Sequence, residues 1–385
     1  MNYENLFSQN LETNLKGRFI NLNDIEPLLL KFNSDNQVQI IGTSVLGKPI
    51  YKYVLGTGKI KVLLWSQMHG NESTTTKALF DFLNLLNGNS EFAKTLLNEF
   101  TFCCLPMLNP DGALLYTREN ANNIDLNRDA QNLTQPESKL LRSTFDTFKP
   151  DFCYNLHDQR TIYGVGSDKI KPATVSFLAP AYNENRDFNE VRTKAIKVIV
   201  AMNKILQEFI PNQVGRFDDS FNINCVGDTF QFLNVPTILI EAGHFQDDYE
   251  RELTRKFVFI ALAEGFKNIY ENDIVCNEIE DYMNIPHNKI CFYDFIYKNI
   301  KISYDNNKII TNFALQFKEE LIDKQLFFNI YTAALGDLEG FSGHFECDVD
   351  GALYEDLEIN FPKMDQKAEF SLGNSIKFVD GLIEN

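Results

Sequence analysis

The sequence lacks the features that would assign the chain to several specialised classes. It has no Cys-x-x-Cys pair, and its seven cysteines are an odd number, several of them inside apolar runs such as FTFCCLPML. We therefore expect small buried thiols in a reducing compartment, which argues against a cysteine-ligated zinc site. The N-terminus has no apolar core of signal-peptide type, and no apolar run approaches the roughly 20 residues of a membrane helix. These absences predict a cytoplasmic protein that does not act at a membrane.

Positive charge is also scarce. The 53 acidic side chains outnumber the 36 Lys and Arg side chains, which gives a formal net charge of −17. An acidic surface repels phosphate backbones, so we do not expect a nucleic-acid partner. The net charge says little about the substrate, because a local basic pocket can lie in an acidic protein. The hydrophobic fraction of 44% is ordinary for a globular protein, and 385 residues indicate about two domains.

No internal repeat or low-complexity segment is visible; instead, strand and helix patterns alternate over the first 275 residues. After a short helical lead-in at 1–35 and a hairpin with a buried strand in 38–66, the predicted strands are 100–107, 151–156, 174–178 and 235–240, and the predicted helices are 137–148, 189–209 and 247–270. This alternation predicts an α/β domain over 1–275, with a mixed, largely parallel sheet flanked by helices.

The pattern changes near the C-terminus. Beyond residue 290, runs of strand length alternate with Asp, Asn, Gly and Lys turns, and helical periodicity fades. We expect residues 290–385 to form a small, β-rich, sandwich-like accessory domain. No motif in it indicates chemistry, so it could brace the main domain, cover part of a cleft or mediate dimerisation.

Four polar residues stand where predicted strands end. His69 and Glu72 follow the first buried strand, His157 follows the strand at 151–156, and Glu241 follows the one at 235–240. Ligands of open α/β sheets bind outside the carboxyl ends of the strands, so we expect these side chains along one rim. Two imidazoles and one carboxylate are a standard ligand set for a catalytic zinc, with a fourth position left for water.

Taken singly, these residues have plainer interpretations. An HxxE pair such as His69 and Glu72 arises readily by chance, and a histidine at a strand end is often a structural residue held by hydrogen bonds. Gly70, beside the first histidine, is expected to let the backbone bend tightly there.

The segment LPMLNPDGALLYTRENANNIDLNRDAQN, residues 105–132, joins these separate signals into an ordered series. The series resembles the zinc carboxypeptidase family over roughly residues 35–270, and its form His-Gly-Asn-Glu at 69–72 looks like the bacterial members. The segment IGTSVLGKPIY at 41–51 also looks like the hairpin that begins the family's domain. The matching motifs, in family order, are HxxE at 69–72, Asn-Pro-Asp-Gly at 109–112, Arg118, Asp-Leu-Asn-Arg at 125–128, His157 and Glu241.

The resemblance implies one Zn²⁺ per chain, held by His69, Glu72 and His157. It also implies that Glu241 is the general base. The chemistry is reasonable on general grounds, because zinc lowers the pKa of a bound water to about 7. A nearby carboxylate can then take a proton from that water and pass it to the leaving amine.

The resemblance further implies roles for three substrate contacts. Arg118 would polarise the scissile carbonyl, while Asn127 and Arg128 would hold the free carboxylate of the substrate's last residue. A guanidinium can stabilise a developing oxyanion and grip a carboxylate through two hydrogen bonds. Without the surrounding motifs, each of these arginines would be assigned to a surface ion pair.

These motifs predict a zinc metallopeptidase that hydrolyses the C-terminal bond of a peptide, with a peptide or amino-acid-derived substrate bearing a free carboxylate. A zinc deacylase acting on N-acyl amino acids is the first alternative, because Asn71 stands where digestive-type carboxypeptidases usually carry Arg. The Asn-Pro-Asp-Gly turn and Arg118 look more like the peptidase branch. A non-catalytic binding protein on the same scaffold is the second alternative, and the oligomeric state is not predicted.

Two regions leave substrate recognition open. The digestive-type enzymes carry a mobile Tyr before the general base, but this chain has no Tyr between Tyr182 and Tyr249. Residues 226–229 could line the substrate pocket, although we expect an ordinary loop there. The three residues after His157, at 158–160, could contact substrate or orient the imidazole.

Overall fold

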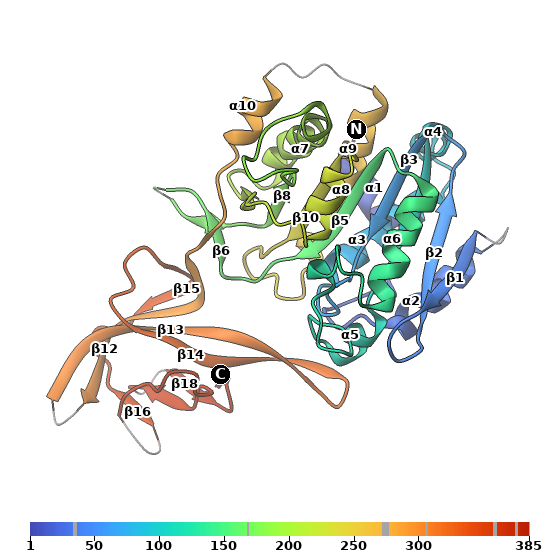
Figure 1. Ribbon diagram of the computed structural model, residues 1–385. Helices are drawn as coiled ribbons and strands as arrows, with labels where there is room; N and C mark the ends of the chain where they lie inside the picture. Colours follow the sequence, from blue (N-terminus) through green and yellow to red (C-terminus); the bar gives the residue numbers. More distant parts are fainter. Residues whose placement is uncertain are drawn as a thin grey trace. The chain divides into compact units, whose positions relative to one another are not determined.

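The computed structural model describes residues 1–33, 37–167, 169–271, 277–304, 307–356, 360–373 and 376–384. The chain folds into two compact units (Figure 1), of which the first combines Met1–Gln159 with Ala173–Asn288 and the second combines Arg160–Pro172 with Lys289–Asn385. The end of the lead-in predicted for 1–35, the predicted boundary at residue 275 and Cys276 all fall outside the described residues.

The first unit is an α/β domain. Its helices are α1 (Tyr3–Asn10), α2 (Leu22–Phe32), α3 (Thr74–Leu86), α4 (Glu91–Glu99), α5 (Pro110–Leu115), the 3₁₀ helix η1 (Leu126–Arg128), α6 (Pro136–Phe148), α7 (Glu190–Phe209), α8 (Val226–Phe232), α9 (Glu252–Glu271) and α10 (Glu278–Met283). Its strands are β1 (Val38–Thr43), β2 (Pro49–Leu55), β3 (Ile60–Trp65), β4 (Phe100–Leu105), β5 (Phe152–Asp158), β8 (Val175–Leu178), β9 (Val214–Arg216) and β10 (Thr237–Ala242).

These eight strands form one mixed sheet in the order β1-β2-β4-β3-β5-β10-β8-β9. β3 runs parallel to β4 and β5, β5 runs parallel to β10, and β8 runs parallel to β9. The pairs β1–β2, β2–β4 and β10–β8 are antiparallel. The prediction of a mixed, largely parallel sheet flanked by helices is confirmed.

Helices cover both faces of the sheet (Figure 1), so successive residues of a central strand enter two different cores. In β5, Tyr154 and Leu156 pack in the larger core with α3, α7 and α9, whereas Cys153 packs in the smaller core with α6 and α8. Trp65 of β3 faces the smaller core and meets Phe230 of α8 edge to face. The strands therefore read as nearly continuous apolar runs.

The second unit is β-rich, as predicted. It has a small sheet in the order β11-β6-β7 and two four-stranded sheets in the orders β14-β13-β12-β15 and β16-β17-β18-β19. The strands are β6 (Tyr163–Val165), β7 (Lys171–Pro172), β11 (Lys289–Ile290), β12 (Phe292–Tyr304), β13 (Asn307–Ile322), β14 (Gln325–Gly336), β15 (Ser342–Asp348), β16 (Tyr354–Asp356), β17 (Phe370–Leu372), β18 (Ile376–Val379) and β19 (Leu382–Glu384).

Local turn chemistry and aromatic packing both support this unit. Asp323 and Lys324, the two residues between β13 and β14, both have positive φ. That is the conformation of the tight turns that match strand twist in a hairpin. In the unit's core, the ring of Phe370 stacks on Tyr354 at 4.9 Å and on Phe378 at 4.5 Å between centroids. An accessory role for residues 290–385 remains a prediction.

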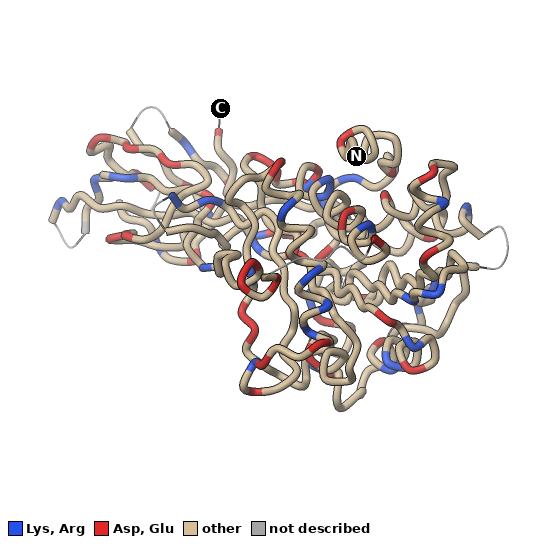
Figure 2. Tube along the Cα trace, turned by 90° about the horizontal axis from the view of Figure 1, so that it is seen from above, with Lys and Arg blue, Asp and Glu red and all other residues tan. Residues whose placement is uncertain are grey.

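Three sequence-based expectations concern composition. The six described cysteines are free thiols; four are buried as expected, and Cys225 and Cys347 are partly exposed. Lys and Arg are interspersed with Asp and Glu along the chain (Figure 2). Among the described residues, none of the helices combines the length and apolar character that crossing a bilayer would take.

Candidate metal centre and substrate site

The candidate site lies on three adjacent parallel strands. The order β3-β5-β10 brings the carboxyl ends of these strands to one edge of the sheet. His69 and Glu72 lie in the turn between β3 and α3, His157 is the next-to-last residue of β5, and Glu241 is the register partner of His157 on β10. His157 thereby becomes a neighbour of His69, which is 88 positions away in the sequence, and of Glu241, which is 84 positions away. The positions of these residues after predicted strands had indicated this.

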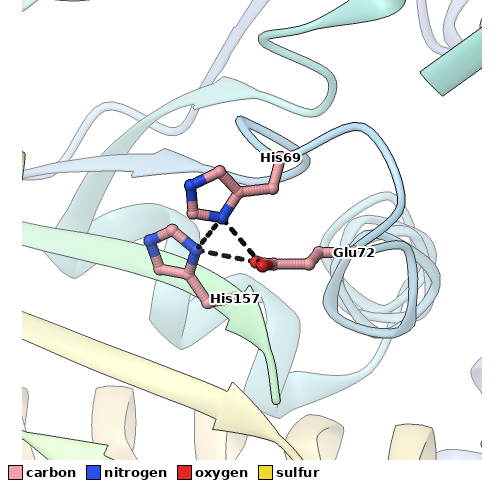
Figure 3. A group of neighbouring side chains, drawn as sticks. All are labelled: His69, Glu72 and His157. Atoms are coloured by element: carbon pink, nitrogen blue, oxygen red, sulfur yellow. Dashed lines mark hydrogen bonds and ion pairs between the residues drawn. The ribbon is translucent and has the colours of Figure 1, made fainter. Parts of the chain in front are cut away.

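His69, Glu72 and His157 point toward one another (Figure 3). His69 Nδ1 lies 2.8 Å from Glu72 Oε1, His157 Nδ1 lies 2.8 Å from Glu72 Oε2, and the two Nδ1 atoms are 3.1 Å apart. One ligand atom from each residue falls within 4.8 Å of the others, and all three side chains are buried. Two imidazoles and one carboxylate at this spacing fit a single cation with an open coordination position.

The charge states of His157 and Glu72 favour a cation, whereas the carboxylates of Glu72 and Asp125 outweigh burial and raise the pKa of His69, so that His69 must lose a proton to bind a metal. Burial lowers the pKa of His157 below its ordinary value, so this imidazole is held neutral as a metal ligand requires. Burial alone would raise the pKa of Glu72, but the two imidazoles outweigh it, and the Glu72 pKa lies below its usual range. The buried His157 Nε2 has no hydrogen-bond partner among the described residues.

Close backbone packing shapes the turn that carries His69 and Glu72. A Cβ added at Gly70 would lie 2.0 Å from the carbonyl carbon of Gly112, so Gly70 is needed for contact with α5. The sequence had indicated a tight bend there, but Gly70 does not have positive φ. At the start of α5, the Asn109 side chain accepts a hydrogen bond from Gly112 N at 2.9 Å. The Asn-Pro-Asp-Gly motif is therefore a helix start that supports the metal turn.

Asp158 fixes the other side of this turn. Its carboxylate accepts hydrogen bonds from Thr74 N at 2.8 Å and Thr75 N at 3.1 Å, at the start of α3. Ser73 makes no side-chain cap bond, so Asp158 takes the place of a local N-cap. The Asp158 N–H also donates to Glu72 Oε2 at 3.1 Å. Asp158 thus supports Glu72 and the start of α3, a role different from the two left open for it, contact with substrate or orientation of the His157 imidazole.

Asp125 is a site residue that sequence reasoning missed. Its Oδ1 lies 3.0 Å from His69 Nε2, and its Oδ2 accepts bonds from Arg118 Nε at 3.2 Å and Nη2 at 3.1 Å. A carboxylate on the far nitrogen of a ligating histidine fixes the tautomer and raises the ligand's basicity. The signal was present, because Asp125 is the first residue of the Asp-Leu-Asn-Arg motif.

Arg118 is placed against the metal cluster. Besides its bonds to Asp125, its Nη1 donates to Glu72 Oε1 at 3.0 Å. The preceding residue, Thr117, accepts a backbone bond from Asn71 N, which ties the Arg118 loop to the metal turn. The Arg118 side chain is 42% exposed, so its guanidinium can still meet a ligand.

Glu241 is partly buried beside His157. Burial raises the Glu241 pKa well above its ordinary value, and the nearby carboxylates of Glu72 and Asp158 raise it further, while Arg118 partly offsets them. A divalent cation in the cluster would oppose this shift and favour the ionised form that a general base needs.

Asn127 and Arg128 lie in η1, on the side of the site that faces α8. Asn127 Oδ1 accepts a hydrogen bond from Val226 N at 3.0 Å, so the amide nitrogen of Asn127 is the end that remains for a substrate. The exposed Arg128 contacts Asn127 O with Nη1 at 3.1 Å. The role of Asn127 and Arg128 in holding a substrate carboxylate stays a prediction.

Two expectations about the surroundings need correction or completion. Residues 226–229 were expected to form a loop, but Val226–Phe232 is the helix α8, because Val226 and Phe230 are buried in the smaller core. Its seven residues include Gly227 and β-branched residues of low helix propensity, so the local sequence did not indicate it.

Gln159 is buried and bonds with Ala173 O and Asn288, whereas Arg160 is exposed.

Comparison with known proteins agrees with this geometry. The model of the family described as zinc carboxypeptidase matches residues 29–196 of this chain. That range contains the cluster of His69, Glu72 and His157, together with Asp125 and Arg118. Glu241 lies beyond it.

Individual relatives are similar over shorter stretches. Carboxypeptidase 2 of Trichophyton rubrum is 31% identical over 131 residues, covering 34% of this chain and 24% of that protein. Gamma-D-glutamyl-L-diamino acid endopeptidase 1 of Lysinibacillus sphaericus is 35% identical over 83 residues, covering 20% of this chain and 21% of that protein. The chain therefore spans about a quarter of the length of the curated relatives it matches.

The fold is similar to that of solved structures. A metallo-carboxypeptidase from Burkholderia cenocepacia aligns with a TM-score of 0.51 and 19% identity, over 66% of this chain and 70% of that one. At this identity the likeness concerns the fold.

Proposed function

We propose that this chain, which the zinc carboxypeptidase family model matches over residues 29–196, is a zinc-dependent metallopeptidase that hydrolyses the C-terminal peptide bond of a peptide. The observation that carries the proposal is the buried cluster of His69, Glu72 and His157, with ligand atoms within 4.8 Å of one another. These three residues would hold the zinc ion. When bound, zinc supplies a water molecule that ionises near neutral pH and a Lewis acid for the scissile carbonyl.

The chain's own residues account for the proton transfers. Glu241, the strand neighbour of His157, would take a proton from the attacking water and later give it to the leaving amine. Asp125 would hold His69 in the tautomer that leaves Nδ1 free as a ligand, since Asp125 Oδ1 lies 3.0 Å from His69 Nε2. Arg118, whose Nη1 donates to Glu72 Oε1, would stabilise the negative oxygen of the tetrahedral intermediate.

Recognition of a free C-terminus would fix which bond is cut. Arg128 carries an exposed guanidinium, and Asn127 is oriented by Val226 so that its amide nitrogen can donate. Together they could hold both oxygens of a terminal carboxylate. A carboxylate held there places only the last peptide bond near Glu241, which makes the enzyme an exopeptidase.

The proposal is tested by a hydrolysis screen with matched substrates. Each peptide is supplied with a free and with an amidated C-terminus, and N-acyl amino acids are added as a third class. We expect the C-terminal residue to be released from the free peptides alone, and we expect a zinc chelator to abolish release until zinc is restored. Equal cleavage of free and amidated peptides would refute the role given to Arg128.

Two other outcomes would point to the alternatives raised by the sequence. Turnover of N-acyl amino acids without turnover of peptides would identify a deacylase, in keeping with the His-Gly-Asn-Glu form at 69–72. Peptide binding without zinc and without turnover would identify a binding protein.

A further inference from the structure

An irregular segment near the N-terminus lies against the turn that carries two of the proposed zinc ligands. Residues 11–20, here called the N-terminal strap, join α1 to α2 and form neither helix nor strand. They precede residues 29–196, the part of the chain that the family model matches. Leu15 and Ile20 of the strap are buried in the larger core. The strap is therefore an ordered part of the α/β domain that lies outside the family match.

The strap holds the end of the metal turn, which comprises residues 66–73 between β3 and α3. Ser73, directly after Glu72, donates its hydroxyl hydrogen to Arg18 O at 2.5 Å. Ser73 is fully buried and Arg18 is nearly so, so water does not compete for this bond. The bond fixes the course of the chain just after the carboxylate ligand.

The strap also holds the beginning of the metal turn. Gln67, two residues before His69, has a φ of 48°, a left-handed conformation that is unfavourable for residues other than glycine. Its Nε2 donates to Ile20 O at 2.7 Å and to Gly70 O at 2.9 Å, and its Oε1 accepts from Thr76 Oγ1 at 3.0 Å. The strap therefore supplies one of the bonds that hold a strained residue of the turn.

Two helices of the larger core fix the strap itself. Arg255 of α9 donates to Leu15 O at 2.7 Å, and it forms a buried ion pair with Asp81 of α3. Glu252 of α9 accepts a hydrogen bond from Gly17 N at 3.2 Å. The strap is thus tied to α3 and α9 on one side and to the metal turn on the other.

We propose that the N-terminal strap holds the metal turn in the arrangement that binds zinc. Arg18 and Ile20 are positioning residues, because their carbonyl groups accept the bonds from the turn. The inference rests on the proposed zinc site. A chain whose turn has left this arrangement must restore it before the ion binds, so the apparent dissociation constant rises as the fraction of competent chains falls. Saturating zinc restores the arrangement, so the loaded enzyme keeps its turnover.

Gly17→Ala perturbs the strap without changing any residue of the metal turn. Gly17 has a φ of 70°, and a Cβ there would lie 2.9 Å from Glu250 Oε2, so alanine strains the strap and crowds Glu250. Gly47→Ala is the matched control, because Gly47 has a φ of 77° between β1 and β2 and its Cβ would meet nothing within 4 Å. Both variants should lower the melting temperature.

Zinc affinity, measured by competition with a chromogenic chelator, separates the two variants. We expect Gly17→Ala to bind zinc about 3–10-fold more weakly than wild type, and Gly47→Ala to stay within about twofold. At saturating zinc, the kcat of Gly17→Ala should return to within about twofold of wild type. A purely structural defect would not be confined to limiting zinc in this way.

Ser73→Ala removes the contact from the side of the turn. It should weaken zinc binding by about 3–10-fold, the equivalent of one hydrogen bond. Because Gly17→Ala and Ser73→Ala act on one contact, the double variant should lose less affinity than the product of the two single losses.

The outcomes separate this inference from the function on which it rests. Unchanged zinc affinity in either Gly17→Ala or Ser73→Ala would overturn it, as would equal losses in Gly17→Ala and Gly47→Ala or a double variant that loses the full product. If wild-type protein binds zinc but hydrolyses no peptide, the proposed function fails, while the affinities still decide the role of the strap. If wild-type protein binds no zinc, both fail.

Discussion

Replacing Asp125 by Asn tests how the metal site is held together. The carboxylate receives hydrogen bonds on both oxygens: His69 Nε2 and Asn127 N lie 3.0 and 2.8 Å from Oδ1, and Arg118 donates twice to Oδ2. An Asn side chain has one acceptor oxygen only. Either its NH₂ group faces the Arg118 guanidinium, or it faces His69 Nε2 and favours the tautomer with a proton on Nδ1, the ligand atom.

Both arrangements weaken the metal site by a similar amount. Each hydrogen bond to a charged group is worth about 1.5–3 kcal/mol, and about 1.4 kcal/mol corresponds to a tenfold change in an equilibrium constant. Loss of one such bond, with partial rearrangement, predicts a fall of about 10–100-fold in zinc affinity, the range found for partners of ligating histidines. Hydrolysis at limiting zinc should fall in parallel.

Competition with a chromogenic zinc chelator measures this change directly. Asp129→Asn is a matched control, because Asp129 lies in the same segment and accepts bonds from residues outside the metal cluster, among them Thr134 and Gln135. It should lower the melting temperature and leave zinc affinity within about twofold of wild type. If Asp125→Asn also bound zinc as tightly as wild type, the assignment of Asp125 as the partner of a ligating histidine would be refuted.

Three further changes probe the rest of the site. His157→Ala should lower zinc affinity further than Asp125→Asn, for which a fall of about 10–100-fold is expected. An unchanged metal-to-protein ratio after dialysis would remove His157 from the ligand set. Arg128→Met should raise KM for peptides with a free C-terminus by about 10–100-fold with kcat little changed, because about 1.5–3 kcal/mol of charged hydrogen bonding is lost; an unaltered KM would contradict the carboxylate role. Burial raises the pKa of Asp228 from 3.8 to about 7, so its contribution to the free energy of unfolding is present below about pH 4 and is lost as the pH rises through about 7. Asp228→Asn should therefore lose less stability than wild type between pH 5 and pH 8 in urea titrations, and equal losses would contradict the shifted pKa.

The layout of the sheet and the metal cluster could be predicted because periodicity and order carry that information. Apolar runs of strand length marked β3, β5 and β10, and the polar residue after each run marked the edge at which ligands gather. The contact between His69 and His157, 88 residues apart, follows from parallel pairing of β3 and β5. The alternation of strands and helices predicted a largely parallel sheet, but it did not predict that β3 and β5 are neighbours in that sheet.

The remaining features depend on tertiary contacts that no local pattern encodes. α8 is a helix because Val226 and Phe230 are buried against the sheet, although Gly227 disfavours helix locally. The residue that caps α3 is Asp158, which lies on β5 and is distant in the sequence. The start of that helix could therefore not be recognised from Ser73 and its neighbours.

The central claim is that one zinc ion held by His69, Glu72 and His157 works with Glu241 to cleave a C-terminal peptide bond. The most direct test measures zinc per chain and release of the terminal residue side by side, in wild-type protein and in Glu241→Gln. We predict one zinc per chain in both, with turnover in the variant reduced by about 10²–10⁴-fold because the general base is lost. Turnover in Glu241→Gln within tenfold of wild type, or full activity in zinc-free wild-type protein, would contradict the account.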